Sequence, residues 1–522
     1  MRLARPLAAL ALLASAAAAP LLAQQAIQER LDLAALSRIR DEGLNRSHID
    51  SLAGQLMDVI GPRLTGSPSL RRAQEWARAT FAGWGLANVA IEPWDSLFGR
   101  GWERVSYAAR WTEPYVQPLY AMPLAWSGST RGVVTCPVKV AEMTDSTAFD
   151  RYEGQLRGAC VLLLRAPLRD IGPEWTAHPL RLDADTIISW GAAQPAPQRM
   201  GPPANADAQG RFRAMQGMQQ RMSGWLTRQG IVAILQPSQW QYGLILGSGG
   251  PQQREARDSA NFEPLPALVV SYEQASQMVR NAHRGVDMRL ELNVQNRFTN
   301  PDKREFNVVA EIPGSDLANQ LVMIGAHYDS WYGGTGATDN GAGSVVMMEA
   351  MRILKTLSLP MRRTVRIALW TGEEQGLLGS RDYVRKHAAE MASISAYLNV
   401  DNGSGRLRGV YAQGNTAVMP IFDQILMPFH DLGIVGNTPR NTGGTDHLSF
   451  DAAGVPGFQY IQDPLEYGSR THHSQVDTYD HLVLDDLKQA ATIVAWSVYT
   501  IANRDDMMPR KPAAAPATRA GN

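Results

Sequence analysis

Three apolar runs in the C-terminal half of the chain each end in a histidine or an acidic residue. Residues 321–326 lead into His327, and residues 365–370 lead into Thr-Gly-Glu-Glu. Residues 394–400 lead into Asp401. Helical patterns separate the runs, and this alternation predicts a mixed, largely parallel α/β sheet sandwiched by helices. Ligands bind at the carboxyl ends of the strands in such sheets, so we expect these polar groups to meet at one edge.

A glycine-rich stretch follows the first run, with the sequence GAHYDSWYGGTGATDNGAG over residues 325–343. Glycine weakens helices and strands, so the stretch predicts a loop between a strand and a helix that begins near Gly341. The loop carries Asp329 and Asp339. An ordinary surface loop is one interpretation, and a metal site on the loop is the other.

The residues at this edge form a donor set that suits divalent cations. With His473, which comes late in the chain, there are two imidazoles and four or five carboxylates. So many buried carboxylates are costly without a cation, and nitrogen and oxygen ligands suit zinc. The numbers fit two metals, one on His327 and one on His473, with one of Glu374 and Asp401 on each. Asp339 is placed to bridge them, as in sites where paired metals share the attacking water.

Two roles are less well fixed by the residues alone. Asp329 follows His327 by two positions, so on an extended backbone it lies on the same side and can orient the imidazole. Glu373 and Glu374 are adjacent, and the pattern does not say which is a ligand and which is a base.

Several segments resemble, in order and spacing, the M28 family of zinc peptidases. They are GAHYDS…GATDNGAG, TGEEQGLLGS, LNVD, GGTDHLSF and HHSQVDT, and the stretch GPRLTGSPSLRRAQEWARATFAGWGL resembles the usual N-terminal part of that family. The resemblance implies the zinc exopeptidase fold and two Zn²⁺ ions per chain. It assigns Glu373 as the general base, and it selects His473 over His472 because the family ligand immediately precedes a Ser or Thr. The implied metal ligands are His327, Asp339, Glu374, Asp401 and His473.

The resemblance also predicts the reaction, which is hydrolysis of a peptide bond in a peptide substrate. Glu373 is expected to take the proton of the attacking water and return it to the leaving amine. A free α-amino group held at the metals makes the chain an aminopeptidase or a dipeptidase, that is, a metalloprotease of the hydrolase class. A carboxypeptidase, a glutaminyl cyclase on the same fold and a non-catalytic receptor-like relative are the alternatives.

Composition predicts the domain organisation. We expect a signal peptide over 1–23, a catalytic domain over 24–127 and 294–505, and a disordered tail over 506–522. Short β-branched runs separated by polar stretches predict a mostly β insert over 128–293, which resembles a protease-associated domain. A Pro- and Gln-rich stretch within it, around 195–210, is expected to be a flexible loop.

Export follows from the first residues, which carry two arginines, an apolar stretch and then small residues. We expect a periplasmic or secreted protein with no stable membrane span. With 50 basic and 50 acidic residues the chain has no net charge, so composition gives no support to nucleic-acid binding. Cys136 and Cys160 are the two cysteines, and pairing and free thiols are equally expected. The sequence leaves a homodimer open.

The remaining histidines are expected to be structural, with two exceptions. His472 lies next to a proposed ligand, where lining the cleft and a structural role are equally expected. Asp446 and His447 lie in GGTDHLSF, which the family places near the substrate. For this pair, substrate contact or support of the ligands is weighed evenly against a role in a turn.

Overall fold

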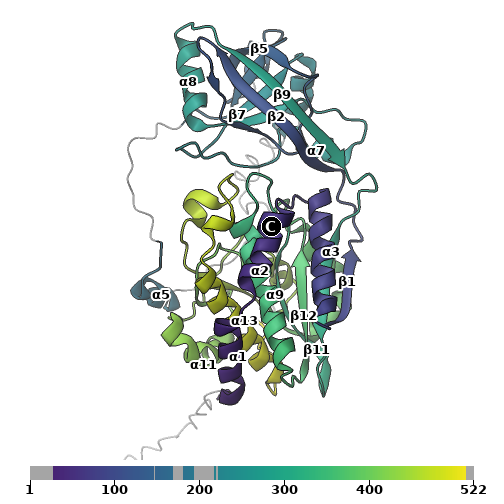
Figure 1. The fold of residues 1–522 in the computed structure, drawn as a ribbon, viewed down its shortest axis with the longest axis vertical. Coiled ribbons are helices and arrows are strands. Elements are labelled where there is room, and N and C mark those ends of the chain that lie inside the picture. The colour runs from purple at the N-terminus through teal and green to yellow at the C-terminus, as the bar shows by residue number, and fades with distance from the viewer. Residues whose placement is uncertain (1–27, 146, 169–179, 193–216, 219–220, 513–522) are drawn as a thin grey trace, which may run out of the picture.

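Two β-sheet regions stacked along the long axis make up the computed structural model (Figure 1). The structure describes residues 28–145, 147–168, 180–192, 217–218 and 221–512. The signal peptide predicted over 1–23 and the polar loop predicted around 195–210 lie outside these residues.

The first sheet has seven strands in the order β1-β10-β12-β11-β13-β15-β14. Its four central strands are parallel, and the outer strands pair antiparallel. The sheet is therefore mixed with a parallel centre, which confirms the predicted fold class. The parallel strands are β11 (Leu317–His327), β12 (Arg363–Trp370), β13 (Ile394–Asn399) and β15 (Gly457–Gln462). The others are β1 (Ala87–Pro93), β10 (Phe306–Ile312) and β14 (Leu407–Tyr411).

Helices cover both faces of this sheet, because its central strands are apolar on both sides. Val322 and Ile324 of β11 belong to the larger core under one helical layer, whereas Met323 packs with Trp370 and Phe450 on the other face. The first layer contains α1 (Leu33–Asn45), α2 (Ile49–Gly54), α3 (Pro68–Gly83), α9 (Ala342–Leu357) and α13 (Leu484–Asn503). The second face is covered by α10 (Leu378–Lys386) and α12 (His447–Ala452). The helix α11 (Met419–Leu426) packs against α13.

The second sheet has eight strands in the order β3-β2-β9-β5-β6-β7-β8-β4, with parallel strands from β5 to β8. It extends beyond the predicted insert of 128–293 at both ends, because β2 to β4 precede residue 128 and β9 ends at Thr299. The strands are β2 (Gly101–Glu113), β3 (Gln117–Pro118), β4 (Ala121–Pro123), β5 (Val134–Glu142), β6 (Cys160–Leu164), β7 (Ala233–Pro237), β8 (Ala267–Val270) and β9 (Arg289–Thr299). Helices α4 (Ala148–Arg151), α7 (Gln253–Asp258) and α8 (Tyr272–His283) accompany them.

Cys136 and Cys160 form a disulfide between the neighbouring strands β5 and β6. Both cysteines are buried in the core of the second sheet. This answers the question that the sequence left open in favour of pairing.

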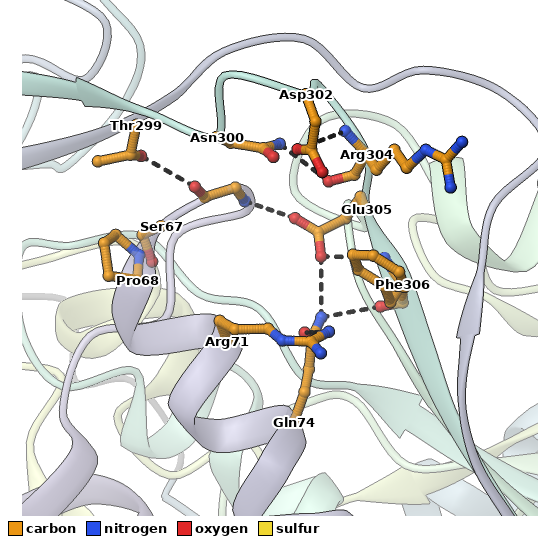
Figure 2. A pocket seen from close by; sticks show the side chains of 11 residues that line it. Ser67, Pro68, Arg71, Gln74, Thr299, Asn300, Asp302, Arg304, Glu305 and Phe306 are labelled. Carbon is orange, nitrogen blue, oxygen red and sulfur yellow. Dashed lines mark hydrogen bonds between the residues drawn. The ribbon is translucent and has the colours of Figure 1, made fainter.

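The two regions are joined by the β1–β2 and β9–β10 connections, and a cavity of about 370 Å³ lies at this junction (Figure 2). At its base the buried carboxylate of Glu305 accepts hydrogen bonds from Gln74 Nε2 at 2.8 Å and from the Gly66 amide at 2.7 Å. Burial raises the pKa of Glu305 to about 7, although these hydrogen bonds act in the opposite direction. Gly66 is also held from the second sheet, because Thr299 Oγ1 donates to its carbonyl at 2.9 Å.

One segment that lies between the strands of the second region in the sequence packs against the first region in the structure. Residues 180–192, with α5 (Ala184–Gly191), pack beside α11 and the edge strand β14 (Figure 1). Arg181 pairs with the buried Asp463 at 3.0 Å. The polar stretches between the short strands therefore include a segment fixed to the first sheet.

The start of the predicted tail is ordered, which corrects the prediction of disorder over 506–522 for its first seven residues. Met508 is buried, and Arg510 Nη2 donates to the carbonyl of Ile394 at 2.8 Å. The Pro- and Ala-rich composition did not reveal these contacts, because they depend on other segments of the same chain. Residues 513–522 lie outside the described part. Within the described residues, we find no helix with the length and apolarity to cross a bilayer.

Candidate metal centre

The carboxyl ends of three parallel strands bring the predicted residues together. His327 ends β11 and is the register partner of Trp370, the last residue of β12. Gly325 of β11 pairs with Asn399 at the end of β13. The loops that follow β12 and β13 therefore begin beside His327, and they carry Glu373, Glu374 and Asp401.

The glycine-rich loop returns Asp339 to the same edge just before α9. Close packing explains its composition. A Cβ at Gly343 would lie 2.1 Å from the carbonyl oxygen of Val400, so only glycine lets the start of α9 approach β13 this closely. Gly336 has φ +63°, and a Cβ there would lie 2.3 Å from the Cβ of Ser330.

Buried Arg63 fixes this loop from the other side. Its guanidinium donates to the carbonyls of Tyr328, Thr335 and Gly336, each at 2.8 Å. It also donates to the carbonyl of Gly61 at 3.0 Å. The backbone between His327 and Asp339 is thus held by one cation.

The five predicted ligands form two groups of three residues that share Asp339. His327 Nε2 lies 3.3 Å from both Asp339 Oδ1 and Asp401 Oδ1. His473 Nε2 lies 3.1 Å from Asp339 Oδ2 and 2.9 Å from Glu374 Oε2. One oxygen of Asp339 therefore faces each histidine.

The groups around His327 favour a positive charge at or beside its imidazole ring. Its Nδ1 lies 3.0 Å from the carbonyl of Asp329, which can only accept, so this nitrogen carries the proton of the ring. Nε2 then points at two carboxylates with a lone pair. Burial lowers the pKa of His327, but the negative charges of Asp401 and Glu373 and the contacts to Asp329 and Asp339 outweigh it and raise that pKa well above its usual value. Either a ring proton or a metal cation satisfies this arrangement.

Buried carboxylate oxygens without hydrogen-bond donors indicate whether a metal ion fits this site. Asp339 Oδ2, Glu374 Oε1 and Asp401 Oδ1 are buried and accept no well-aimed hydrogen bond from the described residues. Buried polar groups are normally satisfied, so three such oxygens in one place point to a cation. Ligand atoms of His327, Asp339 and Asp401 also lie within 4.8 Å of one another. The donor set, nitrogen and carboxylate oxygen, suits zinc.

Asp329 connects several residues of the candidate metal centre through hydrogen bonds. Its carboxylate accepts from the backbone amides of Glu373 at 3.3 Å and Glu374 at 3.4 Å. Thr65 Oγ1 donates to the same carboxylate at 2.8 Å and accepts from the amide of Gly372 at 3.2 Å. We predicted that Asp329 orients the imidazole of His327. In the structure its backbone carbonyl lies 3.0 Å and its carboxylate Oδ1 3.6 Å from His327 Nδ1, and the same carboxylate also holds the loop after β12.

Glu373 and Glu374 have different surroundings. Glu374 contacts His473, whereas no hydrogen bond to the Glu373 carboxylate is found among the described residues. Burial raises the pKa of Glu373 well above its usual value, opposed by the charge of His327 and reinforced by Asp401 and Asp446. Burial also raises the pKa of Glu374, to about 7. A raised pKa suits a group that takes and returns a proton near neutral pH.

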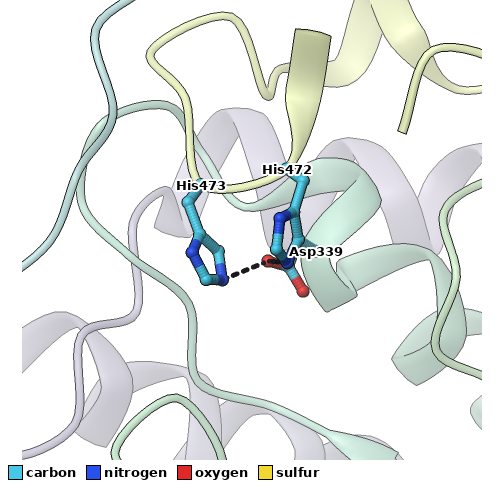
Figure 3. Close-up of side chains that lie close together, drawn as sticks. All are labelled: Asp339, His472 and His473. Carbon is cyan, nitrogen blue, oxygen red and sulfur yellow. Dashed lines mark ion pairs between the residues drawn. The ribbon is translucent and has the colours of Figure 1, made fainter. Parts of the chain in front are cut away.

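The two adjacent histidines both reach Asp339 (Figure 3). His472 Nε2 is 3.8 Å from Asp339 Oδ2, against 3.1 Å for His473, and the two rings stack with centroids 3.8 Å apart. Ligand atoms of Asp339, His472 and His473 also lie within 4.8 Å of one another. The shorter distance and the additional contact to Glu374 favour His473.

Three residues at the site were not singled out from the sequence. Tyr467 Oη donates to Asp339 Oδ1 at 3.1 Å, and Asp477 accepts from the amides of Thr338 at 2.6 Å and Asp339 at 3.2 Å. Thr65 is the third. Asp477 and Thr65 lie in the stretches HHSQVDT and GPRLTGS, but nothing in the letters shows which other chain segment each contacts.

Asp446 and His447 are both fully buried. Asp446 directly precedes α12 and makes no side-chain cap to it. Burial raises the pKa of Asp446 to about 7, and the negative charge of Asp401 adds to this. His447 Nε2 lies 2.8 Å from Gln413 Nε2, and burial lowers the pKa of His447 to about 3. His447 therefore has a structural environment, while Asp446 adds negative charge to the site.

Residues 307–498 match the profile of Peptidase family M28. The domain that carries this site belongs to peptidase family M28. Carboxypeptidase Q of Bos taurus is 29% identical over 460 residues, which cover 87% of this chain and 85% of that protein. With the family match, this makes the chain a metallo-exopeptidase and therefore a hydrolase.

Two solved structures share the fold. A Peptidase M28 precursor from Shewanella amazonensis has a TM-score of 0.66 and 24% identity, covering 91% of this chain and 98% of that one. BSAP, a zinc aminopeptidase from Bacillus subtilis, has a TM-score of 0.57 and 18% identity, covering 88% of this chain and 95% of that one. Because the coverage exceeds the M28 match, the likeness in fold extends beyond residues 307–498.

Proposed function

We propose that this M28 domain is a dinuclear zinc aminopeptidase or dipeptidase. The observation that carries the proposal is the placement of Asp339 between His327 and His473, with one further carboxylate beside each histidine. His327 and Asp401 would hold one Zn²⁺, His473 and Glu374 the other, and Asp339 both. These are the five ligands that the sequence predicted.

The charges around Glu373 support recognition of a free amino terminus. Its strongest charged neighbours are His327 and the carboxylates of Asp401, Asp446 and Glu374. Arg63 is close to the centre, but its guanidinium is fully buried and bonded to backbone carbonyls. A cluster of acidic side chains attracts an ammonium group, whereas binding a C-terminal carboxylate calls for an available cation. This favours an aminopeptidase or dipeptidase over a carboxypeptidase.

The mechanism assigns separate tasks to the residues. Bound zinc supplies Lewis acidity, which lowers the pKa of water and polarises a peptide carbonyl. Glu373 takes a proton from the attacking water at its carboxylate and gives it to the leaving nitrogen. Asp329 holds the backbone of Glu373 and Glu374 and so fixes where that carboxylate lies. Tyr467 donates to Asp339 and orients it.

Export is part of the proposal. It rests on the pattern of charged, apolar and small residues over 1–23, and the disulfide suits an oxidising compartment such as the periplasm or the extracellular space. Sequencing the amino terminus of the mature protein tests it, and we expect a start near Gln24. An intact Met1 on cytoplasmic material would contradict it.

The test of function combines metal analysis with matched substrates. We expect close to two zinc equivalents per chain and loss of activity on chelation. A dipeptide or tripeptide with a free amino terminus should be cleaved. The same peptide with a C-terminal amide should also be cleaved if the chain is an aminopeptidase. The N-acetylated peptide should not be cleaved. Cleavage of the N-acetyl form but not the amide would establish the carboxypeptidase alternative. A single zinc with cyclisation of N-terminal glutamine would establish the glutaminyl cyclase.

A further inference from the structure

We propose that residues 243–247 of the second region position the zinc ligand His473, so that one of the two metals depends on contacts between the regions. This inference rests on the proposed dinuclear site. It gives the second region a task in metal binding.

The contact is an isolated β-bridge between two loops. The Gly247 amide donates to the carbonyl of His473 itself at 2.6 Å, and the Gln475 amide donates to the carbonyl of Ile245 at 3.1 Å. Leu246 and Ser474 form an antiparallel bridge between them. The backbone on both sides of the ligand is thus paired with the second region.

The side chain of Gln475 completes the contact. Its Oε1 accepts from the Ile245 amide at 2.6 Å, and its Nε2 donates to the carbonyl of Gly243 at 2.9 Å. One amide side chain of the metal loop therefore satisfies two backbone groups of the second region. We name residues 243–247 together with Gln475 the interregion clamp.

Close packing holds the clamp against the glycine-rich loop. A Cβ at Gly247 would lie 3.3 Å from the Gly333 nitrogen, and a Cβ at Gly333 would lie 3.2 Å from the carbonyl carbon of Ser474. A side chain at either glycine would therefore require the neighbouring backbone to shift by a few tenths of an ångström. Trp331 borders the same layer, with its ring centroid 6.0 Å from that of His473.

His473 needs such support more than His327 does. His327 ends a central strand and its side chain is 1% exposed, whereas the His473 side chain is 32% exposed. His473 also has φ +60°, which is uncommon for residues other than glycine and has to be held by its surroundings. Its Nε2 contacts the proposed ligands, and its backbone carbonyl accepts from the Gly247 amide of the second region.

The experiment replaces Gln475 with Met, which has similar length and no hydrogen-bonding groups. Zinc affinity is measured by competition with a chromophoric chelator, and hydrogen exchange is measured over 472–477 with and without zinc. We expect one of the two zinc ions to bind roughly tenfold more weakly, the size typical for loss of a group that orients a ligand. Hydrogen exchange over 472–477 should be faster even in the zinc-free chain.

Two controls isolate the clamp. Gln277→Ala removes a glutamine of α8 that bonds to Tyr115 Oη within the second region, and it should change neither readout. Gly247→Pro removes the amide that donates to His473, while Gly247→Ala adds a Cβ and keeps the amide. The proline variant should weaken the same zinc ion more than the alanine variant does.

The outcomes separate this inference from the proposed function. A wild-type chain that binds a single zinc ion contradicts the dinuclear site, while faster exchange in Gln475→Met still supports the clamp. Unchanged exchange and unchanged affinity in Gln475→Met overturn the clamp, whatever the zinc content. Equal weakening of both zinc ions would also overturn it, because the contact is then not specific to His473.

Discussion

His327 and His473 are two histidines proposed for the same reaction centre, and they are held in different ways. His327 continues a buried strand whose neighbours fix it through the parallel ladder. His473 lies in a loop and is held by backbone contacts to residues 243–247, more than two hundred positions earlier in the chain. The first is positioned within one sheet, and the second depends on the docking of two regions.

This difference indicates which structural changes would displace each of the two proposed ligands. A ligand at the end of a central strand moves only if the core of its sheet moves. A ligand held by loop contacts can be displaced by changes in another region that leave that core intact. The predictions below test this contrast between the strand-end residues and the interregion clamp, from the largest expected effect to the smallest.

The largest effect is expected at the paired glutamates, both of which follow a central strand. Glu373→Gln keeps the size of the side chain and removes the proton acceptor, so kcat should fall roughly 10²- to 10⁴-fold with zinc retained. Glu374→Gln should lower zinc affinity, and excess zinc should restore part of the activity. Zinc titration with kinetics checks both variants. The reverse pattern would exchange the roles of the two residues.

Removing the disulfide tests whether the second region is stabilised separately. It closes a loop between positions 24 residues apart, so Cys136→Ser with Cys160→Ser should cost roughly 3–4 kcal/mol in unfolding free energy. We expect an earlier unfolding transition in calorimetry and weaker binding of the zinc ion at His473. The zinc ion at His327 should bind as before. If both zinc ions are lost together, the two ligands are not independently supported.

The junction between the regions should respond to pH through Glu305. Burial raises its pKa from the ordinary value of 4.5 to about 7, so between these pH values the folded chain binds more protons than the unfolded chain. Folding stability from this group therefore falls as pH rises from about 4.5 to 7. Glu305→Gln should remove this slope, a difference of roughly 3 kcal/mol at most between pH 5 and 8.

Denaturant unfolding at several pH values checks the prediction for Glu305. Glu75→Gln is the matched control, because Glu75 is an exposed glutamate of α3 that pairs with Arg71 and Arg78. Its pKa is lowered by the Arg78 hydrogen bond, so its contribution has the opposite sign and is lost as pH falls. An unchanged pH slope in Glu305→Gln would show that the junction does not hold this carboxyl in a protonated form.

The smallest effect is expected at Thr65, which contacts no proposed ligand directly. Thr65→Val keeps the shape and removes the hydroxyl between Asp329 and Gly372, so the loop that carries Glu373 loses a contact. We expect kcat to fall roughly tenfold with zinc content and KM little changed. Thr65→Ser should restore most of the rate. Equal loss in both variants would show that the methyl group, not the hydroxyl, matters.

Much of the catalytic sheet could be predicted because its signals are local. β11, β12 and β13 read as apolar runs with polar ends, and α3 forms over Pro68–Gly83, where the sequence carries a local signal for the start of a helix. Ser67 caps that helix by accepting from the Leu70 amide at 3.2 Å, and proline occupies the first turn. The second sheet was harder, because β2 to β4 precede the short β-branched runs by which we bounded the insert, and β9 continues beyond residue 293. The order of the tail over 506–512 was missed for the same kind of reason.

The sequence by itself determined which chemical groups are present and which strand ends carry them. His327, Glu373, Glu374 and Asp401 follow apolar runs, and the parallel alternation alone places them at one edge. Only the tertiary structure decided which carboxylate faces which histidine, and that the His473 loop pairs with residues 243–247. The physical reason is that the position of each strand in the sequence, and the residue that follows it, can be recognised from local periodicity. Contacts between loops depend on backbone amides and carbonyls. These groups are nearly the same at every position, so the residue types do not show which loops pair.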